Sequence, residues 1–305
     1  MASGPLGLVC HPQLAAVGRW SGLRGRRTVG AGSFPRCTWV EAERATLLAV
    51  AAHAASHRWA AHATRLAATI HGYLYERSPA EGLTIHGLAL DAARALGHET
   101  GDRFGIADSL MGLAEIDCVQ GRYQEAEDHA REALAVTRRS SVPTFEAQAL
   151  VTLAAICHWR GRYVLAAGYC QQALAICEEL SDRAWEVEAL NTFGQTLLAT
   201  GQPDKARACH TAALDLARHL SIVNGQARSL MGLGEVGRWH GDHGEAHGYY
   251  QQALDQFRDI DNPWGEAEAL NGTGEALAAT GQYEKARAYL TEALTLTERT
   301  GYRYY

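Results

Sequence analysis

The stretch EALNTFGQTLLATGQPDKA, from Glu188 to Ala206, decides the fold because one glycine joins two helical patterns in it. Small and apolar residues recur at three- and four-residue spacing before Gly201, and a second such pattern begins after Pro203. Glycine takes the left-handed conformation that ends a helix, and proline suits the first helical position. The stretch therefore predicts the end of one helix, a tight turn and the start of another.

The same pattern returns every forty residues along most of the chain. The turn glycines are Gly121, Gly161, Gly201, Gly241 and Gly281. A column of small residues precedes them at Ala114, Ala154, Gly194, Gly234 and Gly274, and an alanine column follows at Ala126, Ala166, Ala206, Ala246 and Ala286. One helical hairpin cannot bury both of its apolar faces, so neighbouring hairpins must stack. We predict an all-α, right-handed superhelix (an α-α solenoid) in which these small columns mark close helix packing.

The period divides the chain into a repeat region and an irregular N-terminal part. The five hairpins are expected at residues 101–140, 141–180, 181–220, 221–260 and 261–300, with a short tail to 305. Residues 38–100 lose the glycine column, since Glu81 stands in its place, and predict two degenerate helical hairpins or an N-terminal cap. Residues 1–37 hold five arginines and no acid, which predicts a disordered basic leader; a basic arm for nucleic acid is the alternative.

Composition narrows the classes of protein that fit this chain. The net charge is −6 and the repeat region is acidic, which argues against direct binding of nucleic acid. The longest apolar stretch, Leu47 to Ala55, contains a histidine and is far shorter than a membrane span. Seven cysteines without any CxxC pair indicate reduced, mostly buried thiols. We expect a cytoplasmic protein with no membrane association.

These columns resemble the tetratricopeptide repeat. Its Leu-(Gly/Ala) pair falls on Leu113-Ala114, Leu153-Ala154, Phe193-Gly194, Leu233-Gly234 and, with a departure, Thr273-Gly274. The forty-residue period and the stretch TWVEAERATLLAV, Thr38 to Val50, are similar to the C-terminal region of actinobacterial transcriptional regulators of the antibiotic-regulatory-protein and signal-transducing ATPase type. The chain has no GxxxxGK[ST] loop, so ATP hydrolysis is not implied, and neither is DNA binding.

One stretch suggests other chemistry at first sight. Met231 to His247 reads MGLGEVGRWHGDHGEAH, with a GxGxxG pattern and His243 and His247 four residues apart. A phosphate loop needs a strand before it and a free helix N-terminus, whereas the period places this stretch inside a first helix. The histidine spacing suits a metal, but no cysteine is near and a structural role is favoured. We expect no cofactor, no metal, no catalytic residue and no enzyme activity.

The resemblance implies that the first helices line a concave groove that binds a partner. The candidate groove residues are Glu115, Trp159, Asn191, Gln195, Arg228, Glu235, Arg238, Trp239, Asn271 and Glu275. Glu188 and Glu268 share the column of Arg228, and His158 precedes Trp159. Amides can hold a peptide backbone, tryptophans can anchor it, and acids attract a cation. No lysine stands in these columns, which favours a basic or mixed peptide over an acidic one.

We therefore expect a non-enzymatic scaffold or sensor that binds a protein or peptide in bacterial transcriptional or signalling regulation. Its partner would be a transcriptional regulator acting in trans. The alternative is a receptor whose superhelix encloses a small molecule or a short signalling peptide. The ending RTGYRYY, Arg299 to Tyr305, adds no capping helix, so we also expect an exposed apolar face at the last hairpin and self-association through it.

Overall fold

The computed structural model describes residues 36–57, 59–95, 103–140 and 143–300, which form thirteen α-helices and no strand. The N-terminal helices are α1 (Arg36–Ser56), α2 (Ala60–Arg77) and α3 (Pro79–Ala95). The hairpins that follow are α5 (Arg103–Val119) with α6 (Tyr123–Ser140), α7 (Pro143–Trp159) with α8 (Tyr163–Leu180), α9 (Arg183–Ala199) with α10 (Pro203–His219), α11 (Val223–His240) with α12 (His243–Asp259), and α13 (Pro263–Ala279) with α14 (Tyr283–Thr300). The predicted all-α solenoid of helical hairpins is confirmed.

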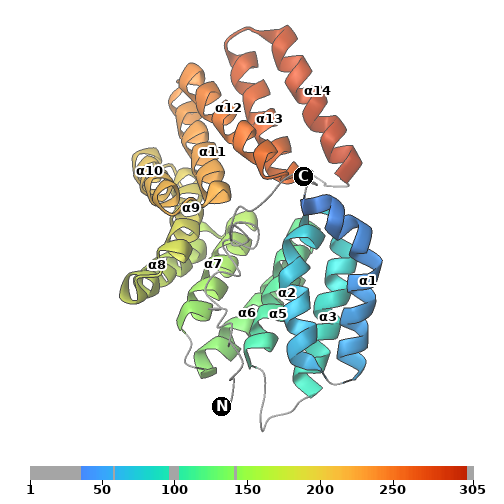
Figure 1. The fold of residues 1–305 in the computed structure, drawn as a ribbon. Coiled ribbons are helices and arrows are strands. Elements are labelled where there is room, and N and C mark those ends of the chain that lie inside the picture. Colours follow the sequence, from blue (N-terminus) through green and yellow to red (C-terminus); the bar gives the residue numbers. More distant parts are fainter. Residues whose placement is uncertain (1–35, 58, 96–102, 141–142, 301–305) are drawn as a thin grey trace, which may run out of the picture.

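Each hairpin packs its two helices together and then packs on the next hairpin, as Figure 1 shows. The first helices α5, α7, α9, α11 and α13 also contact one another in succession, which places them along one side of the stack. The alanine column that follows the turns is buried throughout, from 0% exposure at Ala126 to 2% at Ala286. A small side chain there lets the helices approach closely.

The predicted turn chemistry is present at both kinds of joint. The five turn glycines have positive φ angles between 69° and 84°. Asn262 caps α13 by accepting a hydrogen bond from the Gly265 amide at 2.9 Å, and Pro263 occupies the first helical position. A second set of left-handed residues, which the sequence analysis did not predict, lies between repeats at Ser181, Ser221 and Asp261, with φ between 54° and 56°.

The two kinds of turn should respond in opposite ways when glycine is removed from one and introduced into the other. Gly201→Ala should lower the free energy of unfolding by about 1 kcal/mol, because a methyl group would meet no atom within 4 Å and only the positive φ penalises it. Ser221→Gly should raise the free energy of unfolding by about 0.5 kcal/mol, because glycine adopts the positive φ at this position without a steric penalty. Urea denaturation of both variants measures this, and a stable Gly201→Ala protein would contradict the left-handed turn.

The described residues of the N-terminal part, 36–57 and 59–95, form three helices, α1 to α3. The choice between two degenerate hairpins and an N-terminal cap stays a prediction. α1, α2 and α3 pack on one another, and α2 and α3 pack on α5. His71 Nδ1 lies 2.9 Å from His86 Nε2, and His71 Nε2 donates to Glu115 Oε2 at 2.8 Å. This chain of polar contacts ties the cap to the first repeat. Residues 1–35 of the expected leader and the tail beyond Thr300 lie outside the described residues, and α1 already begins at Arg36.

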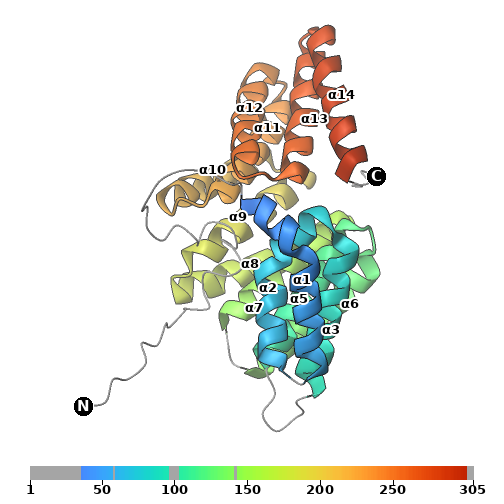
Figure 2. The ribbon, with the colours of Figure 1, turned by 45° about the vertical axis from the view of Figure 1, so that its right-hand side comes forward.

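The superhelix curves until its described ends approach each other. Figures 1 and 2 both show α1 and α2 below the last hairpin. Arg77, the last residue of α2, donates to Asp261 Oδ2 at 2.6 Å, and Asp261 lies between α12 and α13. The concave side is therefore surrounded by repeats from both halves of the chain.

Two further expectations concern the surface. The outer face of α14 exposes Tyr283 at 70% and Leu294 at 59%, so the apolar face expected on the last hairpin is present. Among the described helices, none is long and apolar enough to cross a membrane.

Candidate functional site

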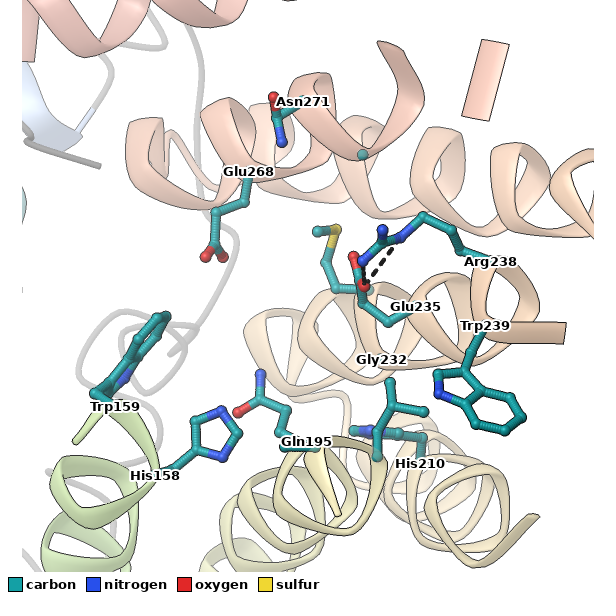
Figure 3. Close-up of a pocket in the computed structure, with 14 residues that line it drawn as sticks. His158, Trp159, Gln195, His210, Gly232, Glu235, Arg238, Trp239, Glu268 and Asn271 are labelled. Carbon is teal, nitrogen blue, oxygen red and sulfur yellow. Dashed lines mark hydrogen bonds and ion pairs between the residues drawn. The ribbon is translucent and has the colours of Figure 1, made fainter. Parts of the chain in front are cut away.

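A hollow of about 500 Å³ opens among the first helices of repeats two to five, and Figure 3 shows its walls. Its lining consists of His158 and Trp159 from α7, Gln195, Leu198 and Ala199 from α9, His210 from α10, Met231, Gly232, Glu235, Arg238 and Trp239 from α11, and Glu268, Asn271 and Gly272 from α13. This volume lies within the range of about 300–1,000 Å³ that is typical of small-ligand sites.

Six of the ten predicted groove residues line this hollow. They are Trp159, Gln195, Glu235, Arg238, Trp239 and Asn271. Their common origin is the forty-residue period, which brings equivalent positions of successive first helices to the same side. Their role in binding stays a prediction, because position alone does not show what they contact.

Asn191 is not available to a partner, so its assignment to the groove surface is wrong. It is 1% exposed. Its Oδ1 accepts hydrogen bonds from Ser229 Oγ at 2.9 Å and from His210 Nδ1 at 3.2 Å, and its Nδ2 donates to the Gly225 carbonyl at 3.4 Å. Both ends of the amide are used inside the protein, and the residue holds α9, α10 and α11 together.

The other three predicted residues lie outside the lining and have partners of their own. Glu115 accepts from His71 of the cap, as described above. Arg228 forms an ion pair with Glu188, the equivalent residue of the preceding repeat. Glu275 accepts from Asn271 Nδ2 at 3.0 Å and lies 3.6 Å from an Arg238 nitrogen. Arg228 and Glu275 therefore contribute charge near the hollow without forming its wall.

Two tryptophans stand at the ends of helices on different walls of the hollow. Trp159 is the last residue of α7 and is 51% exposed; Trp239 is the next-to-last residue of α11 and is 55% exposed. Each indole packs edge-on against a histidine, Trp159 against His158 at a ring distance of 5.9 Å and Trp239 against His240 at 5.5 Å. A half-exposed indole that is held in place loses little entropy when it binds a partner.

The charged residues on α11 form a connected group. Arg238 pairs with Glu235 on the same helix, and Tyr250 Oη donates to Glu235 Oε1 at 2.8 Å. Hydrogen bonding to Glu235 raises the pKa of Arg238, so its positive charge is held firmly. Burial, with Glu235 acting in the same direction, raises the pKa of the Tyr250 hydroxyl, which therefore remains a donor.

Glu268 differs from the other acids of the hollow because no partner in the described part of the chain bonds to its carboxylate. Its side chain extends from α13 into the hollow in Figure 3. Burial raises its pKa to about 8, the nearby Glu235 adds to this, and Arg228 opposes it. Arg228 cannot neutralise it fully because it already pairs with Glu188.

His210 supplies a second unsatisfied group. The residue is fully buried and lines the hollow, and burial followed by the nearby Arg228 lowers its pKa to about 4. Since Asn191 Oδ1 can only accept, the neutral ring carries its hydrogen on Nδ1. Its Nε2 is therefore an acceptor, and none of the described residues forms a hydrogen bond with it. The sequence analysis did not identify His210 as a site residue. The signal that could have found it is a histidine whose ring packs against two glycines of the first helices, Gly194 and Gly232.

The stretch that resembled a phosphate loop lies within α11. Its Gly232 and Gly234 make room for the rings of His210 and Tyr250, which pack directly over the helix backbone. His240 Nδ1 donates to the Val236 carbonyl at 2.9 Å. Among the described residues, no group of three or more metal-binding side chains is present.

The fold and the hollow define a helical-repeat scaffold with a binding surface on its concave side. The chain belongs to the tetratricopeptide repeat proteins: residues 145–219 and 225–299 match one family model of this repeat, and residues 106–143 match another. The matched residues coincide with the five hairpins. No curated protein matches the chain in sequence.

Solved structures confirm the fold. Aspartyl phosphate phosphatase F from Bacillus subtilis has a TM-score of 0.63 and 15% identity, with 81% of this chain and 62% of that chain covered. A Rap protein complexed with competence and sporulation factor has a TM-score of 0.61 and 18% identity, with 85% and 78% covered. NprR in complex with its cognate peptide NprX has a TM-score of 0.62 and 14% identity, with 79% and 68% covered. At these identities the likeness concerns the fold alone.

Proposed function

We propose that this protein is a receptor for a short peptide, which binds in the hollow between α7, α9, α11 and α13. The single observation that carries the proposal is the pair of half-exposed tryptophans on walls of a hollow that also holds unsatisfied polar groups. A peptide suits this mixture because its side chains can cover the indoles while its backbone meets Gln195 and Asn271. The peptide-bound NprR structure shares the fold and supports the choice.

We propose further that the receptor acts without catalysis in bacterial regulation, with a transcriptional regulator as the downstream protein. The resemblance of the forty-residue repeats to actinobacterial regulators supports this, as does the concave binding surface. A cytoplasmic setting suits the free thiols of Cys118, Cys157, Cys170, Cys177 and Cys209, which would stay reduced there. Self-association through the apolar face of α14 is a separate proposal, supported by Tyr283 and Leu294.

A peptide-selection experiment tests the receptor function. A pool of random heptapeptides is passed over immobilised protein, and mass spectrometry quantifies those retained. The double variant Trp159→Ala with Trp239→Ala should retain at least about 30-fold less, since the loss of even one buried tryptophan anchor costs about 2 kcal/mol. Trp59→Ala is the matched control, because Trp59 is 54% exposed but does not line the hollow.

The outcomes separate the candidate functions. Equal retention by the wild type and the double variant would contradict peptide binding in the hollow. A melting shift with a metabolite panel, without any retained peptide, would favour the small-molecule receptor that the sequence left open. Loss of a co-purified regulator in the double variant, again without retained peptides, would favour a scaffold that binds a folded protein.

A further inference from the structure

The ion pairs around the hollow leave an excess of negative charge. Glu188 pairs with Arg228, and Arg238 is shared between Glu235 and Glu275. These contacts use both arginines, so the carboxylate of Glu268 has none. The two histidines of the lining do not offset it, because burial lowers the pKa of His158 and of His210 and keeps both rings neutral near pH 7.

The position of Glu268 explains why it lacks a partner. Glu188, Arg228 and Glu268 occupy the same place in successive repeats, so the arginine stands between two acids. Arg228 bonds to Glu188 on the N-terminal side. Glu268 belongs to the last repeat described, and the next helix, α14, has no equivalent residue on the concave side.

A second acceptor lies at the wall of the same hollow. His210 is fully buried, its Nε2 is an acceptor without a partner among the described residues, and its ring lines the same hollow as Glu268. Glu268 becomes an acceptor as well once it is ionised, so a ligand group with several N–H donors suits this hollow better than one with acceptors only. A guanidinium has five such donors and an ammonium three, whereas a carboxylate or phosphate has none when ionised.

Trp159 adds an aromatic surface to this side of the hollow. Figure 3 shows the Glu268 carboxylate extending toward the side on which Trp159 lies. The indole is the aromatic ring with the strongest attraction for a cation placed over its face. A carboxylate and an indole on facing walls would hold one organic cation between them.

We propose that the hollow contains a cation subsite in which Glu268 and Trp159 bind the guanidinium or ammonium group of a peptide ligand. This inference rests on the proposed function, since it names the chemical group by which the peptide is recognised. The subsite requires a positive charge on the ligand and a negative charge on Glu268. Gln195 also lines the hollow, where its amide can meet the neighbouring backbone.

Small blocked amino acids test the subsite without the rest of a peptide. The probes are N-acetyl-arginine N-methylamide and its citrulline analogue, which has nearly the same shape but no charge. Binding is followed by NMR through the indole N–H signals of Trp159 and Trp239. We expect the arginine probe to bind at least tenfold more tightly than citrulline, and Glu268→Gln to abolish that preference.

Two further probes identify which cationic group is bound, and one further variant controls for long-range electrostatic attraction. N-acetyl-lysine N-methylamide presents a side-chain ammonium, and glycine N-methylamide presents the ammonium of a peptide N-terminus; the tightest probe names the group. Glu266→Gln removes the same charge from the same helix at a residue that pairs with Arg258 and lies outside the lining, so it should keep the preference for arginine. Equal losses in both variants would overturn the subsite in favour of long-range attraction.

The affinity should also depend on pH in one direction. Burial raises the pKa of Glu268 to about 8, so the empty subsite holds a proton at pH 6 that a bound cation displaces. Arginine affinity should therefore rise by up to about tenfold per pH unit from pH 6 to 8 and then level off. Of the groups facing Glu268, Arg228 pairs with Glu188 and Glu235 pairs with Arg238, while burial lowers the pKa of His158 and lowers that of His210 to about 4.

The results separate this inference from the receptor function. Peptides retained by the hollow, together with no preference for arginine over citrulline, would overturn the subsite and leave the receptor intact. Arginine bound through Glu268, without any retained heptapeptide, would support the subsite and contradict the receptor. A pH-independent affinity of the arginine probe would overturn the role of Glu268.

Discussion

A Tyr250→Ala variant should lose about 4 kcal/mol of unfolding free energy, more than any other single truncation that we propose. Tyr250 is completely buried between repeats four and five. Its ring packs against Gly234 on one side and Gly272 on the other, where an added methyl group would lie 2.9 Å from the ring. Because glycine has no side chain that could move into the space, the cavity would persist.

Urea denaturation measures the loss of unfolding free energy. Two control variants, one at the preceding residue and one that removes only the Tyr250 hydroxyl, test its cause. Tyr249→Ala removes the same side chain one residue earlier, where it is only partly buried, and should cost less than about 1 kcal/mol. Tyr250→Phe keeps the ring but removes the donor to Glu235, and should cost about 1 kcal/mol. Equal stability of the Tyr249→Ala and Tyr250→Ala proteins would contradict the packing described.

Hydrogen exchange adds a spatial test of the same variant. Repeat proteins unfold in parts, since each hairpin contacts only its neighbours. Tyr250→Ala should therefore lower protection in α11 to α14 more than in α5 to α8. A uniform decrease along the chain would indicate that the solenoid unfolds as one cooperative unit.

The fold could be predicted because its determinants repeat. Five copies of one column outweigh any single departure, so Pro203 in place of an aromatic residue did not obscure the second helix. A recurring glycine at a predicted helix end indicates a positive φ angle there, since this conformation is costly for other residues. The αL residues Ser181, Ser221 and Asp261 were missed because serine and aspartate at a helix end have several other uses.

The site could be predicted only in part, because it depends on pairings between columns. Asn191 and Asn271 occupy equivalent positions, but Ser229 and His210 bond to the first and bury it, while the second lines the hollow. Glu188 and Glu268 are likewise equivalent, and Arg228 pairs with only one of them. Which residue of a column is satisfied depends on the side chains of both neighbouring repeats, and a single column does not contain that information.

Packing between the helices likewise depends on pairs of columns and not on one column alone. The second helices carry Ala130, Cys170, His210, Tyr250 and Leu290 at one position, and the facing first helices carry Ala114, Ala154, Gly194, Gly234 and Gly274. Larger side chains on one helix thus face glycine on the other. Glycine makes room where the facing side chain is large, as a tightly packed interior requires.

Gly232→Ala decides between two explanations of the glycines in α11. If they only weaken the helix, alanine should stabilise it by up to about 1 kcal/mol. The structure predicts the opposite, because the new methyl group would overlap the imidazole of His210, which is held by Asn191. We expect a loss of about 2 kcal/mol by urea denaturation.

Two further variants make the Gly232 result specific. Gly248→Ala, in the helix α12 with no atom within 4 Å of the added methyl group, should show the stabilisation that Gly232→Ala lacks. Adding Gly232→Ala to a His210→Ala protein should cost almost nothing, since the overlapping ring is gone; the difference is the coupling between the two sites. A Gly232→Ala protein that gains stability in both backgrounds would show that His210 moves aside freely, and its unsatisfied Nε2 would then not be held at the hollow.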